Sequence, residues 1–267
     1  MQITMLDGAL GTELEAAGLD TAGTDWSARP LRSAATCGAI AALHHAYADA
    51  GATVHTAATF RTTARAYGDG WHEALDRAVG LARGAVPAGH RVAGSLAPCE
   101  DCWHPERSPP TAAAEHRATA AALARAGVDL ILCETFTPGN EARAAIDAAL
   151  GTGLPVWVSF TSGPHDALSS PAAVASAARA AAQAGAERVL LNCVPADRCA
   201  RYLDALAASG RPFGVYANGG LGPARLRPEV YAARALEWVA AGATAVGGCC
   251  GAGPAHIRAV VGALGSR

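Results

Sequence analysis

The chain has 267 residues, of which 51% are hydrophobic and 16% charged, so it contains enough apolar side chains for one large core. A net charge of −2 provides no basic field for nucleic acid, and no apolar stretch reaches the roughly 18 residues that span a membrane. All 21 basic residues are arginine, which excludes enzymes that depend on a lysine Schiff base or on the lysine of a P-loop.

The N-terminal segment, residues 1–7, has no positively charged region and no cleavage site, so we expect no signal peptide. This favours a cytoplasmic protein. In that compartment the eight cysteines are expected to be reduced thiols or metal ligands rather than disulfides.

Short apolar runs alternate with alanine-rich stretches along the whole chain. We expect strands at residues 3–6, 53–56, 91–95, 129–133, 156–160, 188–192, 213–216 and 244–246. We expect helices at residues 34–50, 71–85, 111–126, 140–150, 171–184, 196–209, 228–241 and 254–264. Eight strand–helix units without a dividing linker predict a single-domain α/β fold, a (β/α)8 TIM barrel over residues 1–267. An open doubly wound sheet is the alternative, but no G-x-G-x-x-G sequence follows any strand.

Two connections are much longer than the others, residues 19–32 and 98–110. Both are candidates for lids over the mouth of the barrel. The second contains a C-x-x-C sequence, Cys99 to Cys102, which lacks the context of a redox motif and lacks a second pair for structural zinc unless His104 contributes. We expect a disordered lid segment here, with a lid thiol near an active-site metal as the alternative.

Working groups of such barrels lie where the strands end at the carboxyl side. The polar residues at these positions are candidates for binding a substrate: Asp7, Gly8, Thr59, Glu134 and Asn218. Each also has a simpler interpretation, because the carboxylates fit helix caps or loops and the asparagine fits a left-handed turn.

Cysteines stand at two further strand ends. Cys249 and Cys250 follow the last strand between glycines, and Cys193 ends the sixth strand. Adjacent cysteines rarely form a disulfide with each other, whereas three thiolates from two strand ends match a catalytic zinc site with one open position. Packing is the alternative for Cys193 alone, because free cysteine is commonly buried.

The remaining cysteines and the histidines carry less information. Cys37 and Cys133 are expected in the core, and Cys199 is expected to pack from a helix. The nine histidines show no metal-binding spacing, and we expect no metal role for His44 or His45.

Taken together, several motifs resemble the homocysteine S-methyltransferase family over nearly the whole chain. The matching stretches are Asp7-Gly8-Ala9-Leu10-Gly11-Thr12-Glu13-Leu14, Trp26-Ser27-Ala28-Arg29, His44-x-x-Tyr47-x-x-Ala50-Gly51, Glu134-Thr135-Phe136, Trp157-Val158-Ser159-Phe160, Asn192-Cys193-Val194-Pro195, Tyr216-Ala217-Asn218-Gly219-Gly220 and Gly247-Gly248-Cys249-Cys250-Gly251. The Trp-Ser-Ala-Arg stretch looks most like the branch that uses S-methylmethionine or S-adenosylmethionine.

The resemblance implies one zinc barrel without cobalamin or folate domains. Its small-molecule partners would be a thiol acceptor and a sulfonium donor. Two segments depart from the family pattern. Residues 57–60 replace the common Thr-Asn-Thr-Tyr or Thr-Ala-Ser-Tyr, and residues 163–166 replace a Lys-Asp-Gly segment. Both lie near the expected substrate mouth and bear on the identity of the substrates.

Zinc chemistry then suggests a mechanism. Cys193, Cys249 and Cys250 would hold Zn²⁺, and the acceptor thiol would occupy the fourth position as a nucleophilic thiolate. Asp7 and Glu134, helped by the backbone of Gly8, would hold the substrate ammonium group. The alternatives are methylation or demethylation of another small thiol or selenol such as selenocysteine, and a non-catalytic barrel that only binds metal or thiols. The oligomeric state has no signature in the sequence.

Overall fold

The computed structural model describes residues 3–266, and it contains one eight-stranded parallel sheet. Each expected strand is present within a few residues of its predicted bounds. The strands are β1 (Thr4–Met5), β2 (Val54–Thr56), β3 (Arg91–Leu96), β4 (Leu130–Phe136), β5 (Val156–Phe160), β6 (Arg188–Pro195), β7 (Phe213–Asn218) and β8 (Ala245–Gly248).

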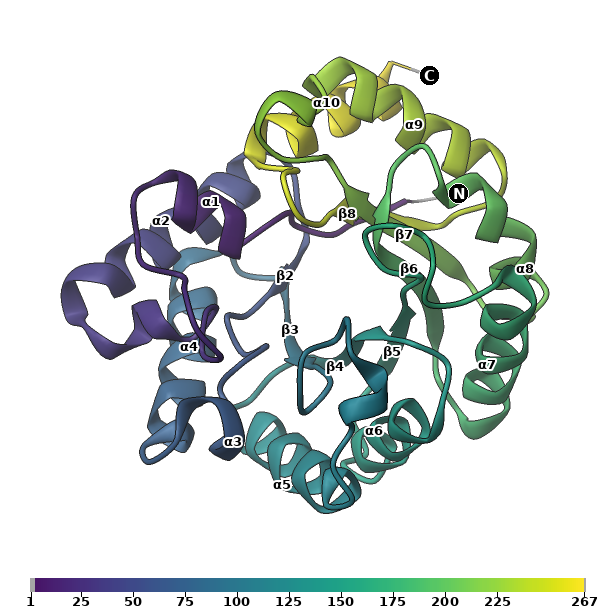
Figure 1. Ribbon diagram of the computed structural model, residues 1–267. Coiled ribbons are helices and arrows are strands. Elements are labelled where there is room, and N and C mark those ends of the chain that lie inside the picture. The colour runs from purple at the N-terminus through teal and green to yellow at the C-terminus, as the bar shows by residue number, and fades with distance from the viewer. Residues whose placement is uncertain (1–2, 267) are drawn as a thin grey trace.

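The sheet closes on itself. Hydrogen-bonded neighbours follow the order β1-β8-β7-β6-β5-β4-β3-β2, and a parallel bridge between Leu6 and Val54 joins the two ends. Figure 1 shows the strands surrounding a central axis with the helices in an outer ring. The predicted (β/α)8 barrel is therefore confirmed, whereas residues 1–2 and 267 of the predicted domain lie outside the described residues.

Helices follow the strands as expected. The long ones are α2 (Ala34–Asp49), α4 (Trp71–Ala85), α5 (Ala112–Arg125), α6 (Asn140–Leu150), α7 (Pro171–Ala184), α9 (Pro228–Ala240) and α10 (Pro254–Gly265). Three short helices are α1 (Gly11–Ala16), α3 (Ala64–Tyr67) and α8 (Leu203–Ala207). Residues 3–266 contain no helix that combines the length and the apolar character needed to cross a membrane.

One predicted helix differs from the structure. In place of a continuous helix over residues 196–209, a 3₁₀ turn (Cys199–Tyr202) precedes the short α8. The hydroxyl of Tyr202 donates to Asp166 and to the carbonyl of Ser169, on the connection after β5. These are tertiary contacts that helical periodicity does not reveal.

Two apolar layers hold the barrel together. Inside it, side chains from alternate positions of the strands pack on one another, among them Leu132, Trp157 and Leu190. A larger layer between strands and helices consists mainly of alanine and valine with a few aromatic residues. Because alanine side chains are small, close packing of this layer brings the helices near the strands.

Candidate active site

A cavity of about 910 Å³ opens at the carboxyl ends of the strands. Both long connections contribute to its wall, the first through Trp26 and Ser27 and the second through Cys102 and Trp103. The two connections that were predicted as lids, residues 19–32 and 98–110, therefore each form part of the cavity wall. Asp7, Gly8, Glu134 and the three strand-end cysteines also line this space.

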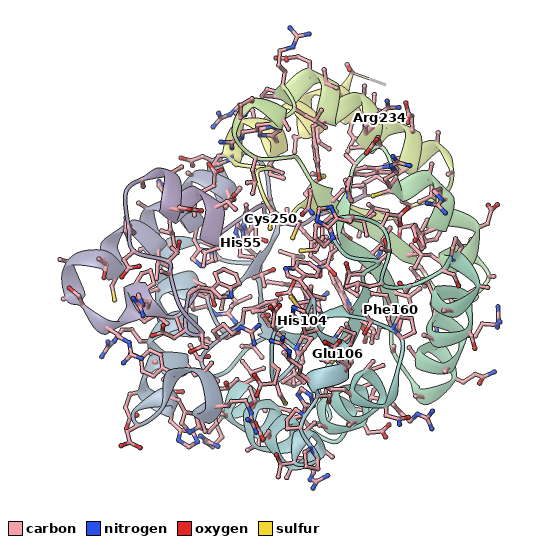
Figure 2. The ribbon with its side chains drawn as sticks, in the orientation of Figure 1. His55, His104, Glu106, Phe160, Arg234 and Cys250 are labelled. Atoms are coloured by element: carbon pink, nitrogen blue, oxygen red, sulfur yellow. The ribbon has the colours of Figure 1, made fainter. Side chains whose placement is uncertain are left out.

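The structure brings Cys193, Cys249 and Cys250 together. Their sulfur atoms all lie within 4.8 Å of one another, and we call these three residues the thiol cluster. Cys193 lies near the end of β6, and Cys249 and Cys250 follow β8 directly. Figure 2 shows Cys250 beside the opening of the barrel. The donor set is chemically suited to a soft cation such as zinc.

Backbone hydrogen bonds hold the cysteine pair in place. The N–H of Cys249 donates to the carbonyl of Ala217 at 2.8 Å, and the N–H of Gly219 donates to the carbonyl of Cys250 at 2.8 Å. Gly251 has φ +77°, and a Cβ at this position would lie 1.7 Å from the carbonyl oxygen of Gly220. Glycine is therefore required here, because the two loops touch at the backbone.

Two irregularities in the sheet direct side chains into the site. The β4–β5 register shifts between Cys133 and Phe136, and the β6–β7 register shifts between Asn192 and Pro195. Thr135 has φ +64° and Cys193 has φ +52°, a left-handed conformation that is uncommon for residues other than glycine. Bulges near active sites commonly re-aim a side chain, and here one of them positions Cys193.

Asn192 joins these two irregular segments. Its Oδ1 accepts from the N–H of Thr135 at 3.1 Å and from the hydroxyl of Ser159 at 2.7 Å, and its Nδ2 donates to the Thr135 hydroxyl at 2.8 Å. The side chain is completely buried. The motif Asn192-Cys193 was visible in the sequence, but the supporting role of the asparagine depends on contacts across the sheet.

The three thiols share protons unequally. Hydrogen bonds from Cys193 and Cys249 lower the pKa of the Cys250 thiol well below its usual value. Hydrogen bonding to Cys249 and Cys250, followed by burial, raises the pKa of Cys193. The hydrogen bonds within the thiol cluster therefore shift the pKa values of two neighbouring thiols in opposite directions, and a bound cation would lower the pKa of both.

Asp7 and Glu134 form a carboxylate pair on the same cavity. Asp7 accepts from the N–H of Thr56 at 2.8 Å, and Glu134 accepts from the hydroxyls of Ser95 and, at 3.0 Å, Tyr216. Burial raises the pKa of both carboxyl groups, and the negative charge of Glu134 raises that of Asp7 further. A cation that binds between them would relieve both effects.

Thr59 and Asn218 occupy supporting positions. Neither belongs to the described residues that line the cavity. The Thr59 hydroxyl donates to the carbonyl of Ser95 at 3.1 Å and accepts from its N–H at 2.8 Å, so it holds the residue that contacts Glu134. Asn218 ends β7 in extended conformation rather than in the left-handed turn considered from the sequence. Its buried Oδ1 has no hydrogen-bond partner.

The other cysteines follow the expectations in part. Cys37, Cys133 and Cys199 are buried. The C-x-x-C segment, however, does not form a disordered lid: Cys99 is buried beside His116, and both Cys99 and Cys102 border the cavity. His104 does not join them, because its ring pairs with Glu106 at 2.9 Å on the exposed side of the connection (Figure 2).

Comparison with known proteins decides the family. The family model described as homocysteine S-methyltransferase matches residues 4–264. The chain belongs to the homocysteine S-methyltransferase family. The predicted resemblance is thereby confirmed, and so is the expectation of a methyltransferase built on a TIM barrel.

Individual relatives in this family resemble the chain over nearly its full length. Homocysteine S-methyltransferase of Escherichia coli strain K12 is 31% identical, with 97% of this chain and 94% of that protein covered. Homocysteine S-methyltransferase 4 of Zea mays is 29% identical, covering 97% and 89% respectively. The structure of the homocysteine methyltransferase MmuM from Escherichia coli in its metallated form superposes with a TM-score of 0.83 at 27% identity, covering 97% of this chain and 96% of that one.

Proposed function

We propose that this enzyme moves a methyl group from a sulfonium donor, S-methylmethionine or S-adenosylmethionine, to the thiol of homocysteine, and that Cys193, Cys249 and Cys250 hold a catalytic zinc ion. The observation that carries the proposal is the thiol cluster itself. Three sulfur atoms within 4.8 Å of one another open onto a cavity that also presents two buried carboxylates.

Zinc fits the residues present. Three thiolates supply soft ligands, and the cavity leaves one side of the cluster accessible to a substrate sulfur, which matches a zinc site with an open position. When bound, zinc supplies positive charge that stabilises the acceptor thiolate at neutral pH. Hydrogen bonds from Cys193 and Cys249 lower the pKa of Cys250, which favours the thiolate form that binds a metal.

The carboxylate pair provides the second half of acceptor recognition. Asp7 and Glu134 are both buried on the cavity, and each is fixed by hydrogen bonds. We assign them to the ammonium group of homocysteine, with the backbone of Gly8 beside them on the cavity wall. A cation between two buried carboxylates replaces their mutual repulsion by attraction.

Aromatic side chains on the same cavity suit a sulfonium donor. Trp26 and Phe60 lie with ring centroids 5.3 Å apart, and Trp103 contributes from the second long connection. Aromatic faces attract cations, most strongly where water is excluded. In the reaction the acceptor sulfur forms a bond to the methyl carbon, the bond from that carbon to the donor sulfur breaks, and the donor leaves as a neutral thioether.

The decisive experiment supplies zinc-loaded enzyme with isotopically labelled homocysteine and each sulfonium donor. We expect labelled methionine with at least one donor, the label separating the methylated acceptor from methionine left by S-methylmethionine. If neither donor yields it, homocysteine methylation from a sulfonium is excluded, and another small thiol or selenol becomes the better acceptor.

A variant tests the metal ligands. Cys249→Ala should lose zinc and lower the methylation rate by about 1,000-fold or more, because the open metal position disappears. Cys199→Ala is the matched control, because its buried sulfur is not part of the thiol cluster and donates only to the backbone carbonyls of Val194 and Pro195. Full activity in Cys249→Ala would rule out the proposed zinc site.

A further inference from the structure

A second group of side chains that could hold a metal ion lies outside the thiol cluster. Cys99 follows β3 by three residues, His116 lies on α5, and Glu141 lies in the first turn of α6. The Cys99 sulfur is 3.6 Å from Nε2 of His116, which is 3.2 Å from Oε1 of Glu141, and all three donor atoms lie within 4.8 Å of one another. We call these residues the rim cluster.

The separations of 3.6 Å and 3.2 Å are close to the edge lengths of a zinc tetrahedron. Donors bound to one zinc ion at about 2.3 Å for sulfur and about 2.0–2.2 Å for nitrogen and oxygen lie roughly 3.3–3.6 Å apart. One thiolate, one neutral imidazole and one carboxylate also carry two negative charges, which balance a divalent cation. We propose that the rim cluster is a second metal site, which binds zinc through Cys99, His116 and Glu141 with water as the fourth ligand.

The cysteine of the rim cluster is held in place before any ion arrives. Buried Arg61 donates to the carbonyls of Pro98 and Glu100, the residues on either side of Cys99, at 3.0 Å each. The N–H of Cys99 donates to Oε1 of Glu141 at 2.7 Å. A carboxylate oxygen has further lone pairs, so it can accept this hydrogen bond and still bind a cation. Such support by a second layer of contacts is what a preorganised metal site needs.

Burial and charge agree with this assignment. Cys99 is 7% exposed and His116 2% exposed, so an ion bound there is shielded from competing water. Burial and the neighbouring Glu141 raise the pKa of the Cys99 thiol, an effect that a bound cation reverses.

The site has a structural consequence for the cavity. The three ligands come from the start of the connection 98–110 and from two helices of the outer ring, so a bound ion fastens that connection to α5 and α6. Residues 102 and 103 of the same connection line the cavity. The inferred site therefore positions part of the cavity wall, and it does not depend on the reaction proposed above.

Metal stoichiometry tests the inference independently of activity. The full-length protein, stripped with a chelator and dialysed against Zn²⁺, should bind two equivalents. Cys99→Ser and Glu141→Gln should each reduce this to one, as should Cys249→Ala through the thiol cluster. The double variant Cys99→Ser/Cys249→Ala should bind none. Cys102→Ser is the matched control: it removes the other cysteine of the C-x-x-C sequence, and two equivalents should remain.

Cobalt provides a second readout that folding defects do not mimic. In the Cys249→Ala background, Co²⁺ should give a sulfur-to-cobalt charge-transfer band of a single thiolate, and Cys99→Ser should abolish it while circular dichroism stays unchanged. Zinc content that is the same in Cys99→Ser as in the wild type, whether one equivalent or two, would overturn the proposal; one equivalent that Cys99→Ser abolishes would instead count against zinc at the thiol cluster. Loss of an equivalent in Cys102→Ser would overturn the assigned ligand set.

Discussion

The thiol cluster and the carboxylate pair face one cavity, but the protein holds them in different ways. The thiols depend on the backbone: a bulge at Cys193, and loop contacts at Gly251 that leave no room for a side chain. The carboxylates depend on side-chain and N–H hydrogen bonds from Ser95, Tyr216 and Thr56. A metal site needs ligand positions fixed within a fraction of an ångström, whereas substrate contacts tolerate adjustment. Substitutions that disturb the backbone should therefore be more damaging near the thiol cluster than near the carboxylate pair.

The largest effect is expected at Gly251. Gly251→Ala forces a methyl group against the carbonyl of Gly220 at a left-handed backbone position, and we expect a loss of about 3 kcal/mol in the free energy of unfolding together with reduced zinc content. Urea unfolding and metal analysis measure the two quantities. Gly262→Ala in α10 is the control, because no atom lies within 4 Å of its added Cβ and the helix should gain about 0.5–1 kcal/mol. Equal behaviour of the two variants would contradict the backbone argument.

The free energy of unfolding should also depend on pH, by an amount similar to the loss expected for Gly251→Ala, through a histidine beside the carboxylate pair. His44 lies 4.0 Å from Asp7, and burial lowers its pKa from 6.5 to about 4. Between these values the unfolded chain binds the proton more readily than the folded chain. The free energy of unfolding should therefore fall as the pH drops from 6.5 towards 4, by about 3 kcal/mol from this group.

Unfolding measured across this pH range, in wild type and in two variants, isolates that contribution. His44→Leu should remove about 3 kcal/mol of the pH dependence, and His45→Leu, at an exposed neighbouring position, is the matched control. An unchanged pH dependence in His44→Leu would show that this histidine does not resist protonation in the folded state.

On the substrate side, Glu134→Gln keeps the shape of the side chain and removes its charge. We expect kcat/KM for homocysteine to fall about 100-fold, equivalent to about 2.7 kcal/mol, while zinc content stays unchanged. Cys249→Ala, by contrast, should lose both the bound zinc and the methylation activity. Loss of zinc in Glu134→Gln would show that the two groups of residues are not independent.

The smallest effect is expected for Tyr216→Phe. It removes one hydrogen bond to Glu134, at 3.0 Å, and leaves the ring in place. The kcat/KM for homocysteine should fall about fivefold, equivalent to about 1 kcal/mol. A decrease as large as that of Glu134→Gln would indicate that the tyrosine contacts the substrate directly.

Much of this architecture follows from local patterns. Apolar runs bounded by glycine and proline located the eight strands, because strand and helix periodicity are properties of neighbouring residues. The Gly-Gly-Cys-Cys-Gly stretch and Asn192-Cys193 indicated where the sulfur ligands lie, because parallel strands of a barrel all end at the same rim. The short helices α1 and α3 were not predicted, because they have only six and four residues.

Other features depend on residues that are distant in the sequence. Three sets of contacts join segments that only the closed barrel brings together. Asn192 bonds to Thr135, Thr59 holds Ser95, and Cys99 lies beside His116 and Glu141. The C-x-x-C sequence was expected in a disordered lid segment, yet its first cysteine faces a histidine and a carboxylate from two helices. The sequence by itself determined the barrel and the strand ends that carry the chemistry, because both are encoded within short segments. The tertiary structure decided which side chains share a site, because convergence in space depends on the register and closure of the whole sheet.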